Sequence, residues 1–164
     1  MNKGLTINLS YLPVINFAMQ QNHVPVIREI TLKNTSEEVI NDIDINVRFE
    51  PEFALEYCTH IDSIVPDKEE KITVVPISIS TEFLSNLTER ITGSIKLTAC
   101  KGEEVLAEKH SEISILTFNE WGGSNVMPEI LAAFSTPNHP EISLINKRAS
   151  EILARWTGKP SLNA

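Results

Sequence analysis

The chain has 164 residues and a mass of 18.3 kDa, and its 41% hydrophobic and 22% charged residues exclude collagen, coiled coil and wholesale disorder. The formal net charge is −8, and the whole acidic excess lies in residues 1–117, which hold eighteen Asp and Glu against ten Lys and Arg. Such a surface repels phosphate backbones, so direct binding of nucleic acid by this part is disfavoured.

The N-terminal residues do not have the pattern of a membrane or export signal. No apolar run in the chain approaches the roughly 20 residues that span a bilayer. Residues 1–17 interrupt their apolar side chains with Asn8, Ser10 and Asn16, whereas a signal peptide has a continuous apolar centre. We therefore predict a cytoplasmic protein with no membrane partner.

Residues 1–117 are predicted to form successive β-strands. Apolar and polar residues alternate over 5–11, 43–50 and 91–99, and the run over 43–50 has no fault. Period two with one polar face is typical of an antiparallel sheet that is solvated on one side. In the strand expected over 26–33, Arg28 interrupts the apolar row, so full pairing is expected only after it.

The second half of this part contains weaker signals. The alternation over 71–80 changes parity at Val75-Pro76, which predicts an edge strand or a bulge. Residues 82–89 have helical spacing and are expected to form a one-turn crossover. A strand is predicted to reach the Lys101-Gly102 turn, and a final one ends near Leu116. No connection is long enough for a parallel crossover, so a parallel sheet is excluded.

The spacing of the strands predicts the fold class. Seven or eight short strands at intervals of about ten residues indicate a mainly β protein, an immunoglobulin-like antiparallel β-sandwich over 1–117. Val, Ile and Thr number 35 in the first 117 residues and 7 in the last 47. This drop predicts a change from strand to helix near residue 118, so residues 118–164 are expected to form a helical extension.

A helix is predicted over 141–157. It starts after Pro140 and ends at Gly158, and a shorter helix is expected over 128–134. The longer helix has one apolar stripe, formed by Ile142, Ile145, Ala149, Ile152, Leu153 and Trp156. Because apolar side chains are stabilised when they are removed from water, we expect another surface to cover this stripe. Docking on residues 1–117 of the same chain is favoured over a second copy, which would give a homodimer, and a downstream domain is the third alternative.

The search for chemistry is largely negative. The sequence has no phosphate-binding glycine loop, no H-E-x-x-H and no G-x-S-x-G, and its four histidines are scattered singly. We therefore expect no catalytic residue, no cofactor and no metal site, and hence no enzyme. Cys58 and Cys100 lie in strand-like surroundings and are expected to be buried free thiols.

The most distinctive string is Glu120-Trp121-Gly122-Gly123, where the two parts join. Trp121 could offer a flat ring for a ligand to stack on, but a plug between strands and helices is favoured. Gly122 and Gly123 allow a sharp change of direction there. The candidate interaction residues are these three together with Ile145, Ile152 and Trp156 of the stripe.

Seven short strings occur in an order that resembles a known family. They are residues 22–28 (NHVPVIR), 32–35 (LKNT), 83–90 (FLSNLTER), 120–123 (EWGG), 128–134 (PEILAAF), 137–138 (PN) and 156–162 (WTGKPSL). This order resembles the N-terminal region of very large bacterial superfamily I DNA helicase-like proteins, which often carry a restriction-endonuclease-like part. In that family the motor and nuclease motifs lie far downstream, so no catalytic role is implied for any residue here.

The resemblance implies an excised N-terminal domain, or a short protein that keeps only this module. The expected function is a non-catalytic interaction or scaffolding domain, whose partner is the downstream part of a helicase-like parent or another protein. The alternative is an accessory domain that contacts nucleic acid, through Lys147, Arg148 and Arg155 on one side of the helix. A small hydrolase would need a pocket of convergent polar groups that the sequence does not suggest.

Overall fold

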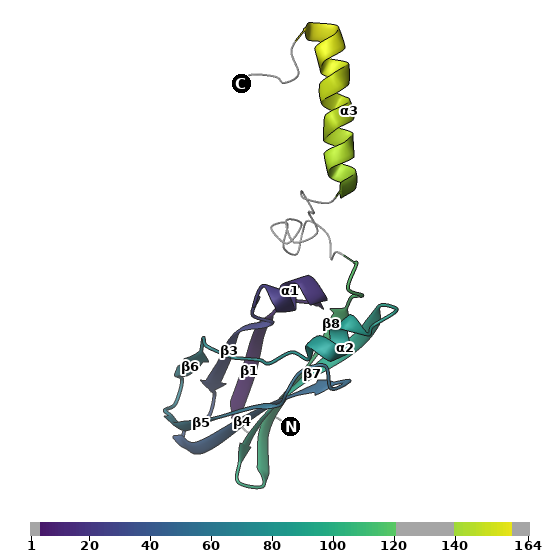
Figure 1. Ribbon diagram of the computed structural model, residues 1–164. Coiled ribbons are helices and arrows are strands. Elements are labelled where there is room, and N and C mark those ends of the chain that lie inside the picture. Colours follow the sequence, from purple (N-terminus) through teal and green to yellow (C-terminus); the bar gives the residue numbers. More distant parts are fainter. Residues whose placement is uncertain (1–3, 121–139, 159–164) are drawn as a thin grey trace. The chain divides into compact units, whose positions relative to one another are not determined.

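The computed structural model describes residues 4–120 and 140–158 (Figure 1). The chain divides into two compact units, Met1–Pro128 and Glu129–Ala164. The first contains every strand that the structure describes, and we call it the β unit. The second contains one long helix. The strands are β1 Leu5–Tyr11, β2 Val14–Ile15, β3 Ile27–Asn34, β4 Ile40–Glu50, β5 Tyr57–Ile64, β6 Glu69–Ile72, β7 Ile91–Lys101 and β8 Glu104–Ile115. The helices are α1 Phe17–Gln21, α2 Thr81–Ser85 and α3 Pro140–Thr157.

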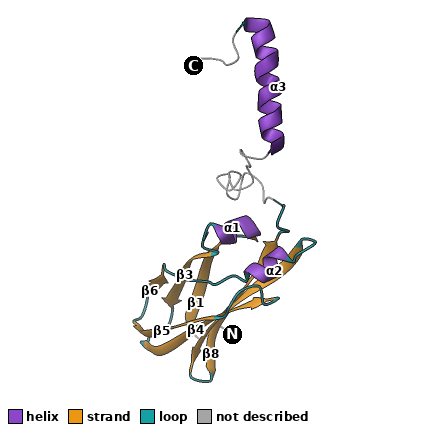
Figure 2. Cartoon of the chain, viewed as in Figure 1, coloured by secondary structure: helices purple, strands orange, loops and turns teal. Residues whose placement is uncertain are grey.

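The strands of the β unit form two sheets (Figure 2). One has three strands in the order β1-β3-β6, and the other has five in the order β2-β8-β7-β4-β5. The prediction of a mainly β protein with seven or eight strands and a C-terminal helix is confirmed. The two short helices, α1 and α2, are linked by a hydrogen bond from Gln20 Nε2 to Thr81 Oγ1, 2.9 Å long.

The alternating residues meet in one core. On β4 the side chains of Ile43, Ile45, Val47 and Phe49 are buried, and on β7 those of Ile95, Leu97 and Ala99. These residues share a single buried cluster with Leu5, Leu9, Ile30 and Leu32 of the three-stranded sheet. Because a shift of one residue would expose each of these rows, the burial of the core fixes the register.

The irregularity expected at Arg28 is confirmed. Ser10 of β1 pairs with Glu29, but the next residue, Tyr11, pairs with Ile27, so Arg28 is left out of the ladder. This is a β-bulge, in which two residues on one strand oppose one on the other. The bulge lets Ile27 and Ile30 both point into the core while the charged Arg28 side chain stays exposed.

The exclusion of parallel pairing is wrong at one place. β2 pairs with β8 in parallel, with Val14 opposite Ser114 and Ile15 opposite Ile115. The exclusion rested on the length of a direct crossover. Here the whole β unit separates the two strands along the chain, so no dedicated crossover is needed.

The strand predicted over 71–80 is wrong in extent. β6 covers only Glu69–Ile72, although it does lie at the edge of its sheet, as expected. Beyond it the chain is irregular, and Val75 is buried while Val74 is exposed. An isolated bridge joins Ile79 to Ala54. Pro76 cannot donate to a ladder, so it does not take part in strand pairing beyond β6.

The prediction that both cysteines are buried is also wrong. Both thiols are free, but Cys58 is exposed and Cys100 is half-buried. They lie on the outer face of the five-stranded sheet, on the two strands that flank β4. Cys58 of β5 is opposite Asn46 of β4, and Cys100 of β7 is opposite Asp44 of β4. Apolar and polar residues alternate regularly around these positions, but both cysteines fall among the residues that face solvent.

The long C-terminal helix is confirmed almost residue for residue. α3 begins at Pro140, and its C-terminal turn closes through a hydrogen bond of 2.9 Å from Gly158 N to Ala154 O. Gly158 has φ +74, a left-handed conformation that favours glycine after a helix. The shorter helix predicted over 128–134 lies outside the described residues, as do Trp121, Gly122 and Gly123.

Candidate functional site

The apolar stripe of α3 is exposed. The side chains of Ile145, Ile152 and Trp156 have exposed fractions of 60%, 46% and 83%, and no residue of the helix is buried. At about 100° per residue the stripe occupies one side of the helix. The structure thus brings three of the six predicted interaction residues onto one face.

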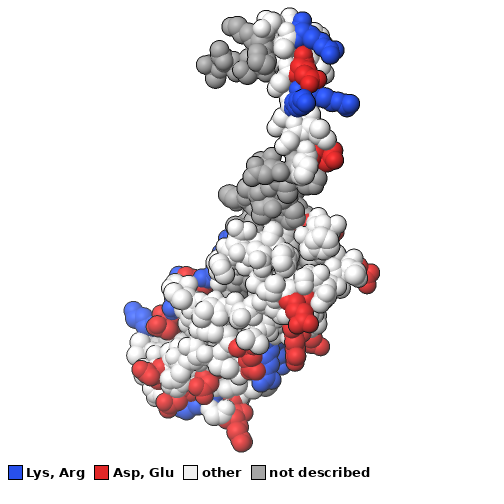
Figure 3. Space-filling model, viewed as in Figure 1, with Lys and Arg blue, Asp and Glu red and all other residues white. Residues whose placement is uncertain are grey.

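The opposite side of α3 is charged. Lys147 and Glu151 lie there in the sequence, Arg148 and Arg155 lie between them and the stripe, and all four are exposed. Figure 3 shows basic and acidic side chains close together on the helix. Leu144 also lies on this side and is 57% exposed, so it is an apolar residue separated from the stripe.

Glu120 is the last residue that the structure describes in the β unit, and its main chain is held in place. Asn16 is buried, and its Nδ2 donates a hydrogen bond of 2.8 Å to the carbonyl oxygen of Glu120. The Oδ1 of the same amide accepts from Met19 N at 2.9 Å and so caps α1. One side chain therefore joins the start of α1 to the residue just before Trp121.

The carboxylate of Glu120 reinforces this anchor. It accepts hydrogen bonds from Thr117 N at 3.2 Å and from the Arg90 guanidinium at 3.3 Å. The hydrogen bond from the Thr117 backbone N–H lowers the pKa of Glu120 most; desolvation opposes it less strongly, and the charge and hydrogen bond of Arg90 lower the pKa further. The carboxylate is therefore charged at neutral pH, and the end of the β unit is held by both its main chain and its side chain.

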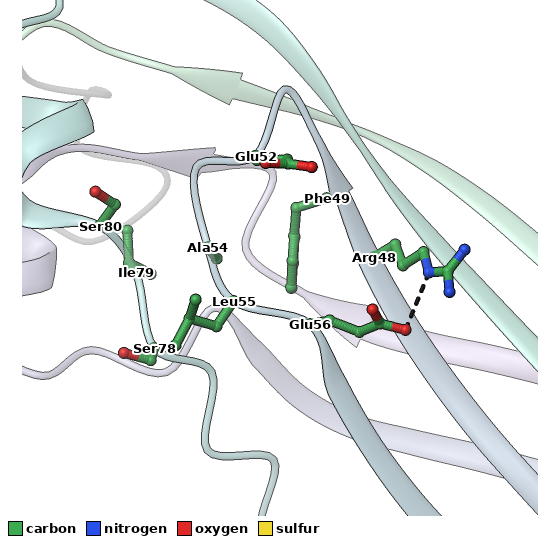
Figure 4. Close-up of a pocket in the computed structure, with 9 residues that line it drawn as sticks. All are labelled: Arg48, Phe49, Glu52, Ala54, Leu55, Glu56, Ser78, Ile79 and Ser80. Carbon is green, nitrogen blue, oxygen red and sulfur yellow. Dashed lines mark hydrogen bonds and ion pairs between the residues drawn. The ribbon is translucent and has the colours of Figure 1, made fainter.

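A pocket of about 750 Å³ lies beside the end of β4, next to the segment that connects β4 to β5 (Figure 4). Phe49, Ala54, Leu55 and Ile79 supply its apolar lining. On one side Arg48 donates to Glu56 at 3.0 Å, and Ser78 and Ser80 lie on the other side. Leu55 is 70% exposed.

Three polar side chains of this pocket already have partners. Arg48 and Glu56 hold each other, and Ser80 Oγ accepts from Phe83 N at 3.1 Å, which caps α2. The arrangement lacks the nucleophile and base within hydrogen-bond reach that acyl transfer requires. The pocket offers an apolar surface with a charged rim.

A second polar cluster lies on the outer face of β4 and β5. His60 Nδ1 is 2.8 Å from Asp44 Oδ1, and His60 Nε2 is 3.7 Å from Asp62 Oδ1. The hydrogen bond to Asp44 raises the pKa of His60, against a smaller effect of desolvation, and the charges of Asp44, Asp62 and Asp42 raise it further. Within residues 4–120 and 140–158, no three His, Cys, Asp or Glu side chains are grouped to hold a metal ion.

Sequence reasoning missed the Asn16–Glu120 anchor. Asn16 stands directly before the first turn of α1, the position at which asparagine is favoured as a cap, so a helix start could have been read there. Its second bond reaches 104 residues along the chain. No local pattern signals a contact of that length.

None of the described helices is both long and apolar enough to cross a membrane. No protein-family model matches the chain, and no curated protein matches it. Among solved structures, the solution NMR structure of a CARDB domain from Pyrococcus furiosus is similar at 13% identity, with a TM-score of 0.46, over 71% of this chain and 98% of that one. A crystal structure of the same domain, in complex with di-metal ions, has 13% identity and a TM-score of 0.41, over 68% of this chain and 87% of that one. Neither match assigns the chain to a family.

Proposed function

We propose that the chain is a cytoplasmic, non-catalytic interaction module, in which an immunoglobulin-like β-sandwich holds an amphipathic helix for a protein partner. The strand order supports the sandwich. β1-β3-β6 corresponds to strands A, B and E of that fold, and β8-β7-β4-β5 corresponds to G, F, C and C′. A single buried cluster drawn from both sheets is what two facing sheets produce.

The exposed stripe of α3 carries the functional proposal. Most helical stability in proteins comes from packing of the apolar face. The stripe ends in Trp156, which is 83% exposed, and tryptophan is among the residues most enriched at the centres of protein interfaces. A helix with this composition is stabilised by a partner that covers the stripe.

The resemblance to helicase-like proteins supplies the biological setting of the proposal. In such a parent the module positions the downstream motor or recruits another protein to it. The anchor at Glu120 supports this role because it gives the segment that follows a defined starting point on the β unit.

Site-specific photo-crosslinking tests the proposal. A photoreactive residue is placed at Ile152 on the stripe and, as the matched control, at Leu144 on the other side of the same helix. We expect a discrete protein adduct from position 152 in cells, identified by mass spectrometry, and none from position 144. Equal adducts at both positions, or none at 152, would contradict the interaction role.

The charged side of α3 favours the second candidate, an accessory domain that contacts nucleic acid. Lys147, Arg148 and Arg155 are exposed together there, but Glu141 and Glu151 lie on the same helix and the β unit is acidic. Gel-shift titration at physiological salt distinguishes the two functions. We expect no complex with single- or double-stranded DNA at micromolar protein, and a nanomolar complex would establish the second candidate instead.

A further inference from the structure

β5 is an edge strand that lacks the protection found at the other edges of the two described sheets. β2 has two residues, and β6 has four, of which three are charged. β1 lies against β8, where Tyr11 Oη donates to Glu112 O at 3.0 Å. Short length, charge and covering are the usual means by which proteins block the addition of a strand. β5 has eight residues, with no proline, lysine or arginine among them, so its edge is the one left open.

The chain itself begins to fill this edge and then stops. Just before β5, Leu55 N donates to Ser78 O at 2.9 Å, and Figure 4 shows Ser78 on the side of this segment away from β4. Pro76 has no N–H and cannot continue the pairing toward β5. Within the described residues, no backbone group outside β4 bonds to residues 57–63. Since an antiparallel ladder uses alternate residues of each strand, the remaining N–H and C=O groups of β5 face the open edge.

The two faces of β5 differ in character. On the inner face Tyr57 and Ile61 are half-buried and pack against the core cluster. On the outer face the Asp62 side chain is fully exposed. Three carboxylates lie near His60, those of Asp42, Asp44 and Asp62. Because three carboxylates outweigh one imidazolium, this face is negative whether or not His60 is protonated.

We propose that the open edge of β5 binds an extended segment of a protein partner as an added strand, with apolar side chains on the inner face and Lys or Arg side chains on the outer face. Main-chain hydrogen bonds to β5 supply affinity, and alternate side chains supply specificity. The apolar side chains complete the burial of Tyr57 and Ile61, and a cation beside Asp62 forms a favourable cross-strand pair. The site lies in the β unit and does not involve α3, so it goes beyond the function proposed above.

A second copy of the chain fits this edge less well than a basic segment does. Two β5 strands paired with each other would bring the same acidic outer faces together, and like charges on adjacent strands destabilise a pair. Residues 1–117 carry eighteen Asp and Glu against ten Lys and Arg, so two β units also repel each other at longer range. The charge of the edge therefore favours a basic partner over self-association.

NMR spectroscopy of the full chain with a defined peptide tests the added strand. The probe is an acetylated and amidated peptide of four Lys-Val repeats, added up to about 1 mM at physiological salt. We expect amide hydrogen exchange in residues 57–63 to slow by about tenfold or more at saturation, because free N–H groups gain partners. The same peptide with a methyl group on every backbone nitrogen keeps its charges and lacks its donors, and it should give no protection.

Charge changes test the sign of the partner. A peptide of four Glu-Val repeats should bind at least about tenfold more weakly, since several cross-strand charge pairs change sign. Asp62→Asn should weaken binding of the Lys-Val peptide by about two- to fivefold. Glu112→Gln is the matched control, because Glu112 is exposed on the outer face of β8, at the other side of the same sheet, and its loss should leave binding unchanged.

Three results would overturn the proposal. The first is an absence of protection at residues 57–63 at every peptide concentration, or equal protection by the methylated peptide. The second is equal binding of the Glu-Val and Lys-Val peptides. The third is protection that rises with the concentration of the chain alone, which would place a second copy at the edge. None of these results depends on the crosslinks from position 152, so the function proposed above would stand or fall separately.

Discussion

Asn34 connects the two sheets through one buried side chain. It is fully buried at the end of β3, and its Nδ2 donates to the carbonyl oxygens of Glu38 at 2.7 Å and Ile64 at 2.8 Å. Its Oδ1 accepts from both the backbone N and the hydroxyl of Ser36. Ile64 ends β5 in the other sheet, so the amide bridges elements that no strand pairing joins.

Replacing Asn34 with alanine should lower the free energy of unfolding by about 2–4 kcal/mol, because several hydrogen bonds are lost and a buried carbonyl oxygen is left without its donor. Urea denaturation measures this change. Asn8→Ala, at an exposed position on β1, is the matched control and should stay within about 0.5 kcal/mol of wild type. Equal effects at the two positions would show that the Asn34 network contributes nothing particular.

His60 should make stability depend on pH. Its pKa is raised in the folded chain, chiefly by the hydrogen bond to Asp44, so the folded state binds the proton more tightly than the unfolded state. The stabilisation is fully present below the unfolded pKa and is lost as pH rises through the higher folded pKa. We therefore expect His60→Gln to lower the stability of the chain more at about pH 5.5 than at about pH 8. The urea midpoints of wild type and variant at the two pH values measure this difference. An NMR titration that places the His60 pKa below its ordinary value would contradict the assignment.

Strands and helices could be predicted from the sequence where their apolar residues recur at regular intervals. β4 was predictable because its core and solvent rows alternate from Ile43 to Glu50, and α3 because its stripe recurs with helical spacing. β5 gave a weaker signal because it is an edge strand on which few side chains are buried. β2 has two residues, too few for any period to be visible.

Part of the candidate site could likewise be predicted from the sequence, and part could not. The stripe on α3 could be found from the sequence because all six residues lie within one helix. The Asn16–Glu120 anchor and the pocket beside β4 could not, because each depends on residues that only the tertiary fold brings together. The expectation that Ile145, Ile152 and Trp156 dock on the β unit stays a prediction.

Close packing around β7 depends on Gly93. A β-carbon at this position would lie 3.0 Å from the carbonyl oxygen of Glu50, 3.0 Å from Cδ1 of Ile115 and 3.2 Å from Cε1 of Phe53. The carbonyl oxygen belongs to the backbone of the neighbouring strand and cannot rotate away. The absence of a side chain at Gly93 therefore lets β4 and the buried Phe53 ring approach β7 closely.

Gly93→Ala should accordingly destabilise the β unit by about 1–3 kcal/mol through overpacking. Ser94→Ala, one residue later on the outer face of β7, is the control and should have little effect. Thermal melting followed by circular dichroism distinguishes the two. An unchanged melting temperature for Gly93→Ala would mean that β4 moves aside at no cost.

At the scale of the whole molecule, the β unit should fold without α3. A chain of residues 1–120 keeps the core, both sheets and the Glu120 anchor, so we expect a β-type circular dichroism spectrum and cooperative melting. A chain of residues 1–116 loses the contacts of Glu120 with Asn16, Thr117 and Arg90. It should remain folded but melt several degrees lower, for a loss of about 1–2 kcal/mol. An unfolded 1–120 chain would show that the two units share one core.

The parallel pairing of β2 with β8 has a mechanical consequence. Beside this pair, Ser114 N donates to Pro13 O and Leu116 N donates to Ile15 O, each at 2.9 Å. The chain enters β2 from its N-terminal side and leaves β8 toward Glu120, so a pull between the two ends slides these parallel strands along each other. The hydrogen bonds then share the tension and break together, whereas a hairpin pulled open at its ends breaks its bonds one after another. A pull on Leu116 at the end of β8 is therefore resisted by these bonds in shear.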